Sequence, residues 1–297
     1  MTDIPTNNDS LDKLGFCAFR NFLSADELKK HISILDDIYK KIGRKSDKFI
    51  HLEQHREAWE IIFNDRMLDV LRSLLGPKIH YLHDASFRYS EEQGTSLASS
   101  QTECPVMWHR DNPCRRFGKG PDWDKNEPYS VVTAVIYLTP YNENKSGVNV
   151  IPFSHKKTYT LSNMLRLIHE KTKNIPFLTK LRNLFPNFVG INVRTNPGDL
   201  IIFKSNLYHT ALPFRNLRHA VYFHYGLDNK HSKNWMNYFH KHRAFTHYKI
   251  DDKDESKYDE FFDLLKRKDI FIPLPEKKES IEASSIPKQE REELRKN

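Results

Sequence analysis

The sequence predicts a mainly β or α+β domain that opens with helices and continues as a series of short strands. Two amphipathic helical patterns lie at 24–38 and 56–75. Runs rich in β-branched and aromatic residues then recur from about 78 to 225. Helices do not alternate regularly with these runs, which argues against a doubly wound parallel sheet. The order favours a sheet-rich core with an N-terminal helical layer.

The first predicted elements are a short strand at 15–20 and a helix that begins at Ser24. Ser24 and Glu27 have the spacing of a capping box, in which each side chain accepts a hydrogen bond from the other residue's backbone N–H. Apolar residues then recur at the spacing of one helix face: Leu28, Ile32, Leu35 and Ile38.

A second helix is predicted over 56–75, and Gly76-Pro77 ends it. Its core candidates are Trp59, Ile62, Leu68 and Leu71. The motifs His51-Leu52-Glu53 and His55-Arg56-Glu57 lead into this helix. We interpret them as its charged surface, because residues i and i+2 do not share a helix face. His51 and His55 have a spacing that suits zinc, but no third ligand follows them.

The remaining elements are mostly strands. They are predicted at 78–90, 130–138, 147–151, 189–194, 199–203 and 219–225. Helical patterns return at 160–172 and 177–184, and polar loops are predicted at 91–104 and 112–128. A loop as long as 112–128 inside a compact domain is usually functional or disordered.

The C-terminal part differs in composition from the rest. A helix is predicted at 258–267, and a highly charged tail follows from about 275. Such a tail buries little apolar surface. We therefore expect a domain over 1–245, followed by a C-terminal helix and charged tail over 246–297.

Composition limits the classes of function. The formal net charge of +8 favours anionic partners such as nucleic acid, phosphorylated metabolites or acidic lipids. No apolar run reaches the about 20 residues of a membrane span, and the N-terminus lacks a signal-peptide pattern, so we expect a cytoplasmic protein without a transmembrane segment. The cysteines Cys17, Cys104 and Cys114 form no Cys-x-x-Cys pair, which indicates reduced thiols rather than disulfides or a thiolate zinc site.

One short motif predicts a metal site. In Trp108-His109-Arg110-Asp111, a strand conformation points His109 and Asp111 to the same side. A second histidine would complete the two-histidine, one-carboxylate triad that suits iron(II) and leaves coordination positions open.

The candidate for that second histidine is His209. It follows the turn 196–199 and the strand 200–203. Arg218 lies nine residues later and enters another strand, where a buried guanidinium can grip a dicarboxylate through two hydrogen bonds. Arg215 is the alternative, but it falls in a predicted turn at 213–216.

These segments, taken in order, resemble the phytanoyl-CoA dioxygenase family of 2-oxoglutarate oxygenases over about 15–226. The similar segments are Gly15-Phe16 to Glu27, Trp108-His109-x-Asp111, the strand 132–138, the segment Ser146-Gly147 to His155, and Pro197-Gly198-Asp199 through His209 to Arg218.

The resemblance implies a fold, a cofactor set and an activity. The fold is a double-stranded β-helix of the jelly-roll or cupin type with N-terminal and flanking helices. The cofactors are Fe(II), the cosubstrate 2-oxoglutarate and O₂, with ascorbate as a reductant, and His109, Asp111 and His209 would hold the metal. The activity is hydroxylation of a small metabolite, acyl or natural-product substrate with release of succinate and CO₂. Because Asp111 is a carboxylate, halogenation is not expected.

The sequence departs from the family pattern at three positions near the expected pocket. Phe153 replaces a glycine, Val135 replaces a frequent tryptophan, and Ala211 replaces a small hydroxyl residue. Cosubstrate contacts are therefore expected to differ from those of other members.

Further candidates surround the predicted pocket. Thr133 and Tyr137 share a strand face and would contact the cosubstrate, although core packing explains them equally well. Arg115 and Arg116, in the basic loop, would meet an anionic substrate unless that loop is merely solvated. The remaining substrate candidates are Arg88 and Asn149. His219 and His224 are interpreted as structural.

Two other functions remain open. A nucleic-acid demethylase on a similar scaffold would use the basic charge, but 215–218 lacks the arginine-rich signature of those enzymes. A non-catalytic binding protein would keep the fold without turnover. We expect a small-molecule substrate and no nucleic-acid partner.

Overall fold

A computed structural model of the chain describes residues 8–42, 48–91, 108, 110–111, 129–140, 142, 147–156, 190–211, 217–242 and 258–274. The predicted helices at 160–172 and 177–184, the predicted loop at 112–128 and the charged tail lie outside these residues.

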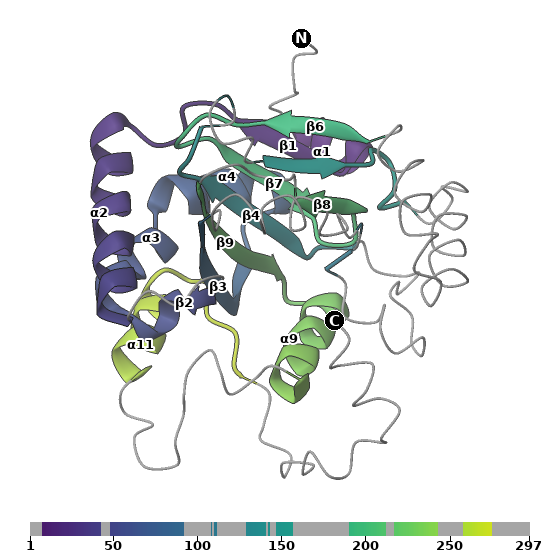
Figure 1. Ribbon diagram of the computed structural model, residues 1–297. Coiled ribbons are helices and arrows are strands. Elements are labelled where there is room, and N and C mark those ends of the chain that lie inside the picture. The colour runs from purple at the N-terminus through teal and green to yellow at the C-terminus, as the bar shows by residue number, and fades with distance from the viewer. Residues whose placement is uncertain are drawn as a thin grey trace, which may run out of the picture.

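Two antiparallel sheets form the centre of the described structure (Figure 1). The strand order is β1-β7-β4-β9-β3-β2 in the six-stranded sheet and β6-β5-β8 in the three-stranded sheet. The larger sheet contains β1 (Phe16–Phe19), β2 (Lys48–His51), β3 (Ile79–Glu91), β4 (Val132–Tyr137), β7 (Leu200–Lys204) and β9 (Leu217–Leu227). The smaller sheet contains β5 (Gly147–Val150), β6 (Ile191–Arg194) and β8 (His209–Ala211). Every strand predicted within the described residues is present, and β2 and β8 are additional.

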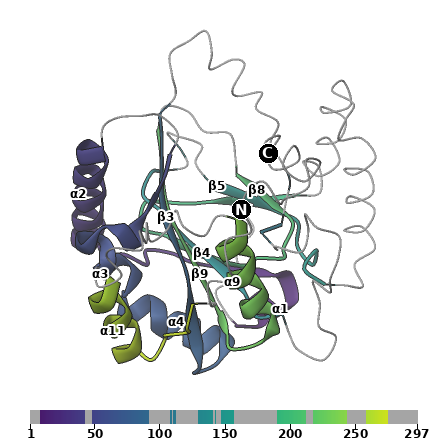
Figure 2. The ribbon, with the colours of Figure 1, turned by 90° about the horizontal axis from the view of Figure 1, so that it is seen from below.

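The helices at 25–42, 59–62, 65–75 and 259–267 cover one face of the six-stranded sheet. The three-stranded sheet and the helix at 230–242 lie on the other side (Figure 2). The helices are α1 (Asn8–Leu14), α2 (Ala25–Ile42), α3 (Trp59–Ile62), α4 (Asp65–Leu75), α9 (Lys230–His242) and α11 (Asp259–Arg267), with 3-10 turns η1 (Leu52–Gln54) and η2 (Arg56–Ala58). In the part of the chain that the structure describes, no helix is long and apolar enough to cross a membrane.

Alternation along β4 separates the two cores. Ala134 and Ile136 face the helices and pack in a cluster that includes residues of α2, α4 and α11. Val135 and Tyr137 face the other way and pack with Val148 of β5. Strand side chains alternate between the two faces of a sheet. We call the face of Val135 and Tyr137, which is turned toward the three-stranded sheet, the inner face. Two antiparallel sheets packed over an inner core confirm the predicted sheet-rich double-stranded β-helix with flanking helices.

The predicted start of α2 is confirmed by its cap. The backbone N–H of Ser24 donates to Glu27 Oε2 at 2.7 Å, and the N–H of Glu27 donates to Ser24 Oγ at 3.2 Å. These two bonds satisfy backbone donors that the first helical turn cannot satisfy itself. The helix then buries Leu35 and Ile38 against the sheet.

The prediction of a single helix over 56–75 is wrong. The segment contains η2, α3 and α4, with a break at Phe63-Asn64. The side chain of Asn64 accepts a hydrogen bond from Met67 N at 3.0 Å, so it caps a new helix. The core candidates Trp59, Ile62, Leu68 and Leu71 are nevertheless all buried.

The interpretation of the segment before it as a charged helix surface is also wrong. Glu53 is fully buried, and its Oε1 accepts hydrogen bonds from the Tyr81 hydroxyl and from Ala85 N at 2.7 Å. Burial is the main cause that raises the pKa of Glu53 to about 8. This carboxyl group is therefore part of the core around β3.

Glu53 lies where β3 is irregular. The pairing of β3 with β9 shifts between Tyr81 and Ala85, and His83 adopts a positive φ of 55°. The segment after α11 supplies part of the missing pairing, because Tyr81 N donates to Ile270 O at 2.9 Å. Glu53 supplies another part through Ala85. A bulge of this kind turns the side chains within it in new directions.

Two helices after the strands complete the described structure. The helix predicted at 258–267 is present as α11, which buries Phe261 and Leu265 in the outer core. The helix α9 was not predicted. It packs close to β9, because Gly226 leaves no side chain there and a Cβ at that position would lie 2.2 Å from Ser232 Oγ. The division of the chain at 245 stays a prediction.

Cys17 is a free, buried cysteine on β1. Burial raises the pKa of its thiol to about 12, so the thiol is protonated and unreactive at neutral pH. The other two cysteines lie outside the described residues.

Candidate metal centre

Asp111 and His209 lie side by side, although they are far apart in the chain. Asp111 Oδ2 is 3.5 Å from His209 Nε2. His209 begins β8 of the smaller sheet, and Asp111 is joined to the larger sheet through a hydrogen bond from its N–H to Ser205 O at 2.8 Å. The contact therefore lies where the two sheets come together. A carboxylate oxygen and an imidazole nitrogen at this separation can both bind one cation.

The ring of His209 is held in an orientation that turns Nε2 toward Asp111. Its Nδ1 is 3.0 Å from Leu207 O. A carbonyl oxygen only accepts hydrogen bonds, so Nδ1 donates, and in the neutral imidazole the lone pair then lies on Nε2. The ring of Phe203 packs against it with 4.6 Å between centroids. Thus the nitrogen that faces Asp111 is the one able to coordinate a metal.

His109 lies outside the described residues, but its two neighbours are described. Trp108 stacks on Tyr208 with 6.1 Å between ring centroids, and the Arg110 guanidinium lies 5.8 Å from the same ring. Arg110 also donates to Ser154 O at 2.9 Å. The described residues alone contain no group of three potential metal ligands. The role of His109 stays a prediction.

Thr133 is part of this site, and Tyr137 lies on the same face. The hydroxyl of Thr133 is 3.2 Å from Asp111 Oδ2, so this residue contacts the predicted metal ligand. Tyr137 is buried in the inner core. The alternation of β4 thus places both residues on the predicted common face.

Two predicted arginines occupy neighbouring strands. Arg88 of β3 pairs with Ala220 of β9, which packs in the inner core. Arg218 lies two residues before Ala220 and pairs with Ser90. Register and alternation therefore place positions 88 and 218 on the inner face.

Of the other substrate candidates, Asn149 is not brought to the site. Asn149 alternates with Val148 and Val150, whose side chains pack in the inner core, so it belongs to the opposite face of the smaller sheet. Arg115, Arg116 and the alternative clamp Arg215 lie outside the described residues.

Sequence reasoning missed a buried pair close to this centre. Nδ1 of His224 is 2.9 Å from Asp84 Oδ2, and the ring lies 4.7 Å from Trp235 of α9. His224 pairs with Thr133 across β9 and β4. Burial lowers the pKa of His224, but the carboxylate of Asp84, and to a smaller extent that of Asp111, raises it above its ordinary value. The alternation of β9 could have placed His224 on the inner face. The bulge in β3 that brings Asp84 to it was not predictable from the sequence.

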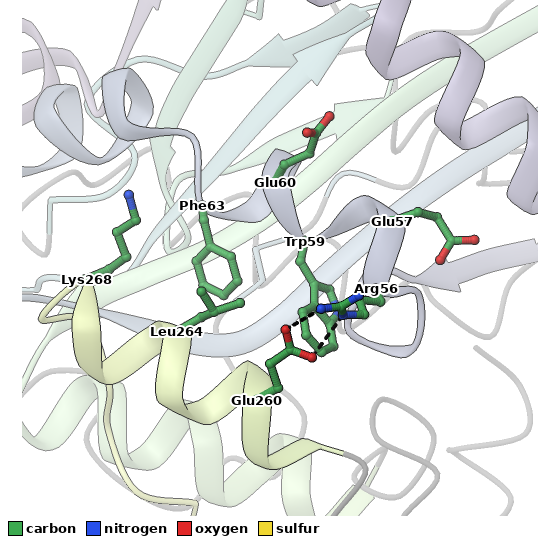
Figure 3. Close-up of a pocket in the computed structure, with 8 residues that line it drawn as sticks. All are labelled: Arg56, Glu57, Trp59, Glu60, Phe63, Glu260, Leu264 and Lys268. Atoms are coloured by element: carbon green, nitrogen blue, oxygen red, sulfur yellow. Dashed lines mark hydrogen bonds and ion pairs between the residues drawn. The ribbon is translucent and has the colours of Figure 1, made fainter.

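A groove on the helical side does not belong to this centre (Figure 3). It lies between α3 and α11, where the Arg56 guanidinium forms two hydrogen bonds with Glu260 beside Trp59. These residues lie on the opposite side of the six-stranded sheet from Asp111 and His209.

Solved structures share this fold. HygX from Streptomyces hygroscopicus, with nickel and 2-oxoglutarate bound, has a TM-score of 0.53 at 17% identity, with 73% of this chain and 85% of that chain covered. SnoK, a non-heme α-ketoglutarate-dependent carbocyclase from nogalamycin biosynthesis, has a TM-score of 0.52 at 15% identity, with 74% and 82% covered. EctD from S. alaskensis, with bound Fe, has a TM-score of 0.50 at 16% identity, with 76% and 79% covered.

A search of curated proteins gave no match. The sequence pattern of the family described as phytanoyl-CoA dioxygenase, in contrast, matches residues 11–219. This range includes both members of the Asp111–His209 pair and the strands that position them. The chain belongs to the phytanoyl-CoA dioxygenase family.

Proposed function

We propose that this protein is an Fe(II)- and 2-oxoglutarate-dependent oxygenase that hydroxylates a small molecule. The observation that carries the proposal is the 3.5 Å separation of Asp111 Oδ2 and His209 Nε2, with Nδ1 of the same ring 3.0 Å from Leu207 O. A carboxylate and a neutral imidazole are two of the three ligands of a non-heme iron site. The structure of HygX contains bound 2-oxoglutarate and that of EctD contains bound Fe, which supports the same cofactors here.

His109 is proposed as the third ligand. Trp108 and Arg110 both contact Tyr208, the residue next to His209. In an extended segment, residues 109 and 111 point away from the side of 108 and 110. The contacts of Trp108 and Arg110 with Tyr208 thus support the proposal that His109 binds the same cation as Asp111.

Arg218 is proposed to bind the distal carboxylate of 2-oxoglutarate. Its strand position on the inner face of β9 supports this role, because a guanidinium there can form two hydrogen bonds with a carboxylate. Arg88, on the adjacent strand and the same face, is proposed to contact the substrate. The basic residues Arg115 and Arg116 remain predicted substrate contacts, whereas Asn149 is no longer proposed as one because it belongs to the opposite face of the smaller sheet.

When bound, the iron would supply the oxidising chemistry with O₂ and 2-oxoglutarate as co-reactants. The chain's contribution is to hold three ligands on one side of the cation and leave the remaining positions open. The inner core around Val135 and Tyr137 excludes water from one side of the centre. Proteins of similar fold include the carbocyclase SnoK and the epimerase SnoN, and hydroxylation is our proposal for this chain.

The test is succinate formation by the purified protein with Fe(II), 2-oxoglutarate and ascorbate under air, alone and with a panel of small metabolites. We expect succinate from the wild type and none from Asp111→Ala or His209→Ala. Asp69→Ala is the matched control, because Asp69 is 75% exposed on α4. A wild-type protein that neither binds divalent metal nor forms succinate would instead be a non-catalytic binding protein. Product formation only on methylated nucleic acid would identify a demethylase.

A further inference from the structure

The oxygen of Asp111 that faces His209 also accepts a hydrogen bond from a buried hydroxyl. Thr133 Oγ1 is 3.2 Å from Asp111 Oδ2, the same atom that lies 3.5 Å from His209 Nε2. The hydroxyl therefore acts on the atom that would coordinate the metal. A second residue, Ser205, lies behind Thr133, with 2.9 Å between the two hydroxyl oxygens.

The direction of these hydrogen bonds follows from the number of protons. An ionised carboxylate only accepts, so the one hydroxyl proton of Thr133 goes to Asp111. Thr133 then accepts from Ser205, which donates its own hydroxyl proton. The result is a directed chain from Ser205 through Thr133 to Asp111. Hydrogen bonds in such chains strengthen one another.

Ser205 also holds the backbone of Asp111. Its carbonyl accepts from Asp111 N at 2.8 Å, and its own N–H donates to Val131 O at 3.0 Å. One residue at the end of β7 thus fixes the metal-ligand segment at the main chain and, through Thr133, at the carboxylate. This double attachment joins Asp111 to the rigid sheet.

The hydroxyl of Thr133 is not needed for the strand. Its neighbours on β4 are Val132, Ala134 and Val135, and valine has the same branched shape and the same preference for strands. Thr133 and Ser205 are 1% and 0% exposed. A buried hydroxyl has a desolvation cost unless it forms hydrogen bonds, and here those bonds lead to Asp111.

We propose that Thr133 and Ser205 are positioning residues that hold the Asp111 carboxylate in the orientation in which Oδ2 binds the metal, and so set the affinity of the site for a divalent cation. This rests on the proposed function, because it assumes that Asp111 is a metal ligand. In this proposal the hydroxyl of Thr133 contacts the carboxylate ligand Asp111 instead of the cosubstrate.

The experiment is Mn(II) binding to the full chain, measured by calorimetry and by the electron paramagnetic resonance signal of free Mn(II). Removing a group that orients a metal ligand typically weakens binding about 10- to 100-fold, and we expect this for Thr133→Val. Thr133→Ser keeps the donor and should bind within about threefold of the wild type. Ser205→Ala removes the donor to Thr133 and should weaken binding as well.

Thr139→Val is the matched control. Thr139 is a buried threonine just beyond β4, and its hydroxyl accepts from His219 N at 3.3 Å instead of contacting Asp111. Its Mn(II) affinity should equal that of the wild type. The absorption spectrum of the Co(II)-loaded protein should change in Thr133→Val and remain unchanged in Thr139→Val, which a loss of general stability would not produce.

The outcomes separate the two proposals. If the wild type binds no Mn(II), the proposed function and this inference both fail. If the wild type binds and Asp111→Ala does not, but Thr133→Val and Ser205→Ala bind as tightly as the wild type, only this inference is overturned. If Thr133→Val does not fold, as judged by thermal unfolding with a chelator, Ser205→Ala decides in the same way.

Discussion

The Asp84 carboxylate lies 2.9 Å from Nδ1 of His224, and both side chains are at least nine-tenths buried. Asp84 reaches this position from the irregular part of β3, where His83 adopts a left-handed backbone conformation. Buried ion pairs contribute little net stability, and strained backbone concentrates at functional sites. The pair therefore indicates that the charged groups on the inner face next to Thr133 have a functional role more than a stabilising one.

The first prediction concerns the pH dependence of stability. The pKa of His224 is raised in the folded protein, since the effect of Asp84 exceeds that of burial. A raised pKa gives stability that is complete below the unfolded value of about 6.5 and is lost as pH rises through the folded value. We expect both His224→Gln and Asp84→Asn to remove this part of the slope in urea unfolding of the chelator-treated protein. An unchanged slope in both variants would contradict the assignment.

The second prediction concerns Glu53 and a different pH window. Its pKa rises from 4.5 to about 8 on folding, so its contribution to stability is complete below about 4.5 and is lost as pH rises through 8. Glu53→Gln should flatten the unfolding free energy across this range. Tyr81→Phe removes a hydrogen bond that lowers the pKa of Glu53, so it should move the loss to higher pH. A wild type equally stable at pH 5 and 9 would count against it.

The third prediction concerns the contact between β9 and α9. Gly226→Ala places a Cβ 2.2 Å from Ser232 Oγ, and overpacking of this kind costs about 1 to 3 kcal/mol of unfolding free energy. Ser232→Ala should be nearly neutral alone and should recover most of the loss in the double variant. Chemical unfolding of the four proteins measures the coupling energy. Additive effects would show that the clash is relieved elsewhere.

Local signals explain the elements that the sequence predicted. The reciprocal bonds of Ser24 and Glu27 depend on residues three apart, and the alternation of β4 depends on neighbours two apart. The metal motif was also readable, because His109, Asp111 and His209 stand in segments with a family-like order. The structure shows the predicted proximity of Asp111 and His209, whereas the position of His109 stays a prediction.

The missed features depend on contacts between distant segments. Glu53 is buried where its carboxylate accepts a hydrogen bond from the N–H of Ala85, 32 residues later, at the edge of the register shift in β3. The break at Asn64 interrupts a pattern whose apolar spacing continues on both sides, so periodicity could not show it. The link from Ser205 to Thr133 requires the register of β4 on β7. No spacing in the sequence predicts which hydroxyls such a register brings together.

The strand order also governs how the chain can fold during synthesis. The strand β4 lies between β7 and β9, which both follow it in the sequence, and among the described strands β1 pairs with β7 alone. While the ribosome is still translating the middle of the chain, the first and fourth strands thus have no neighbours with which to pair. Folding must wait for late residues and is expected to be slow, because loop closure over such separations precedes any gain from pairing. We therefore expect the nascent polypeptide to leave β1 and β4 unpaired for much of translation, an exposure that favours binding by chaperones.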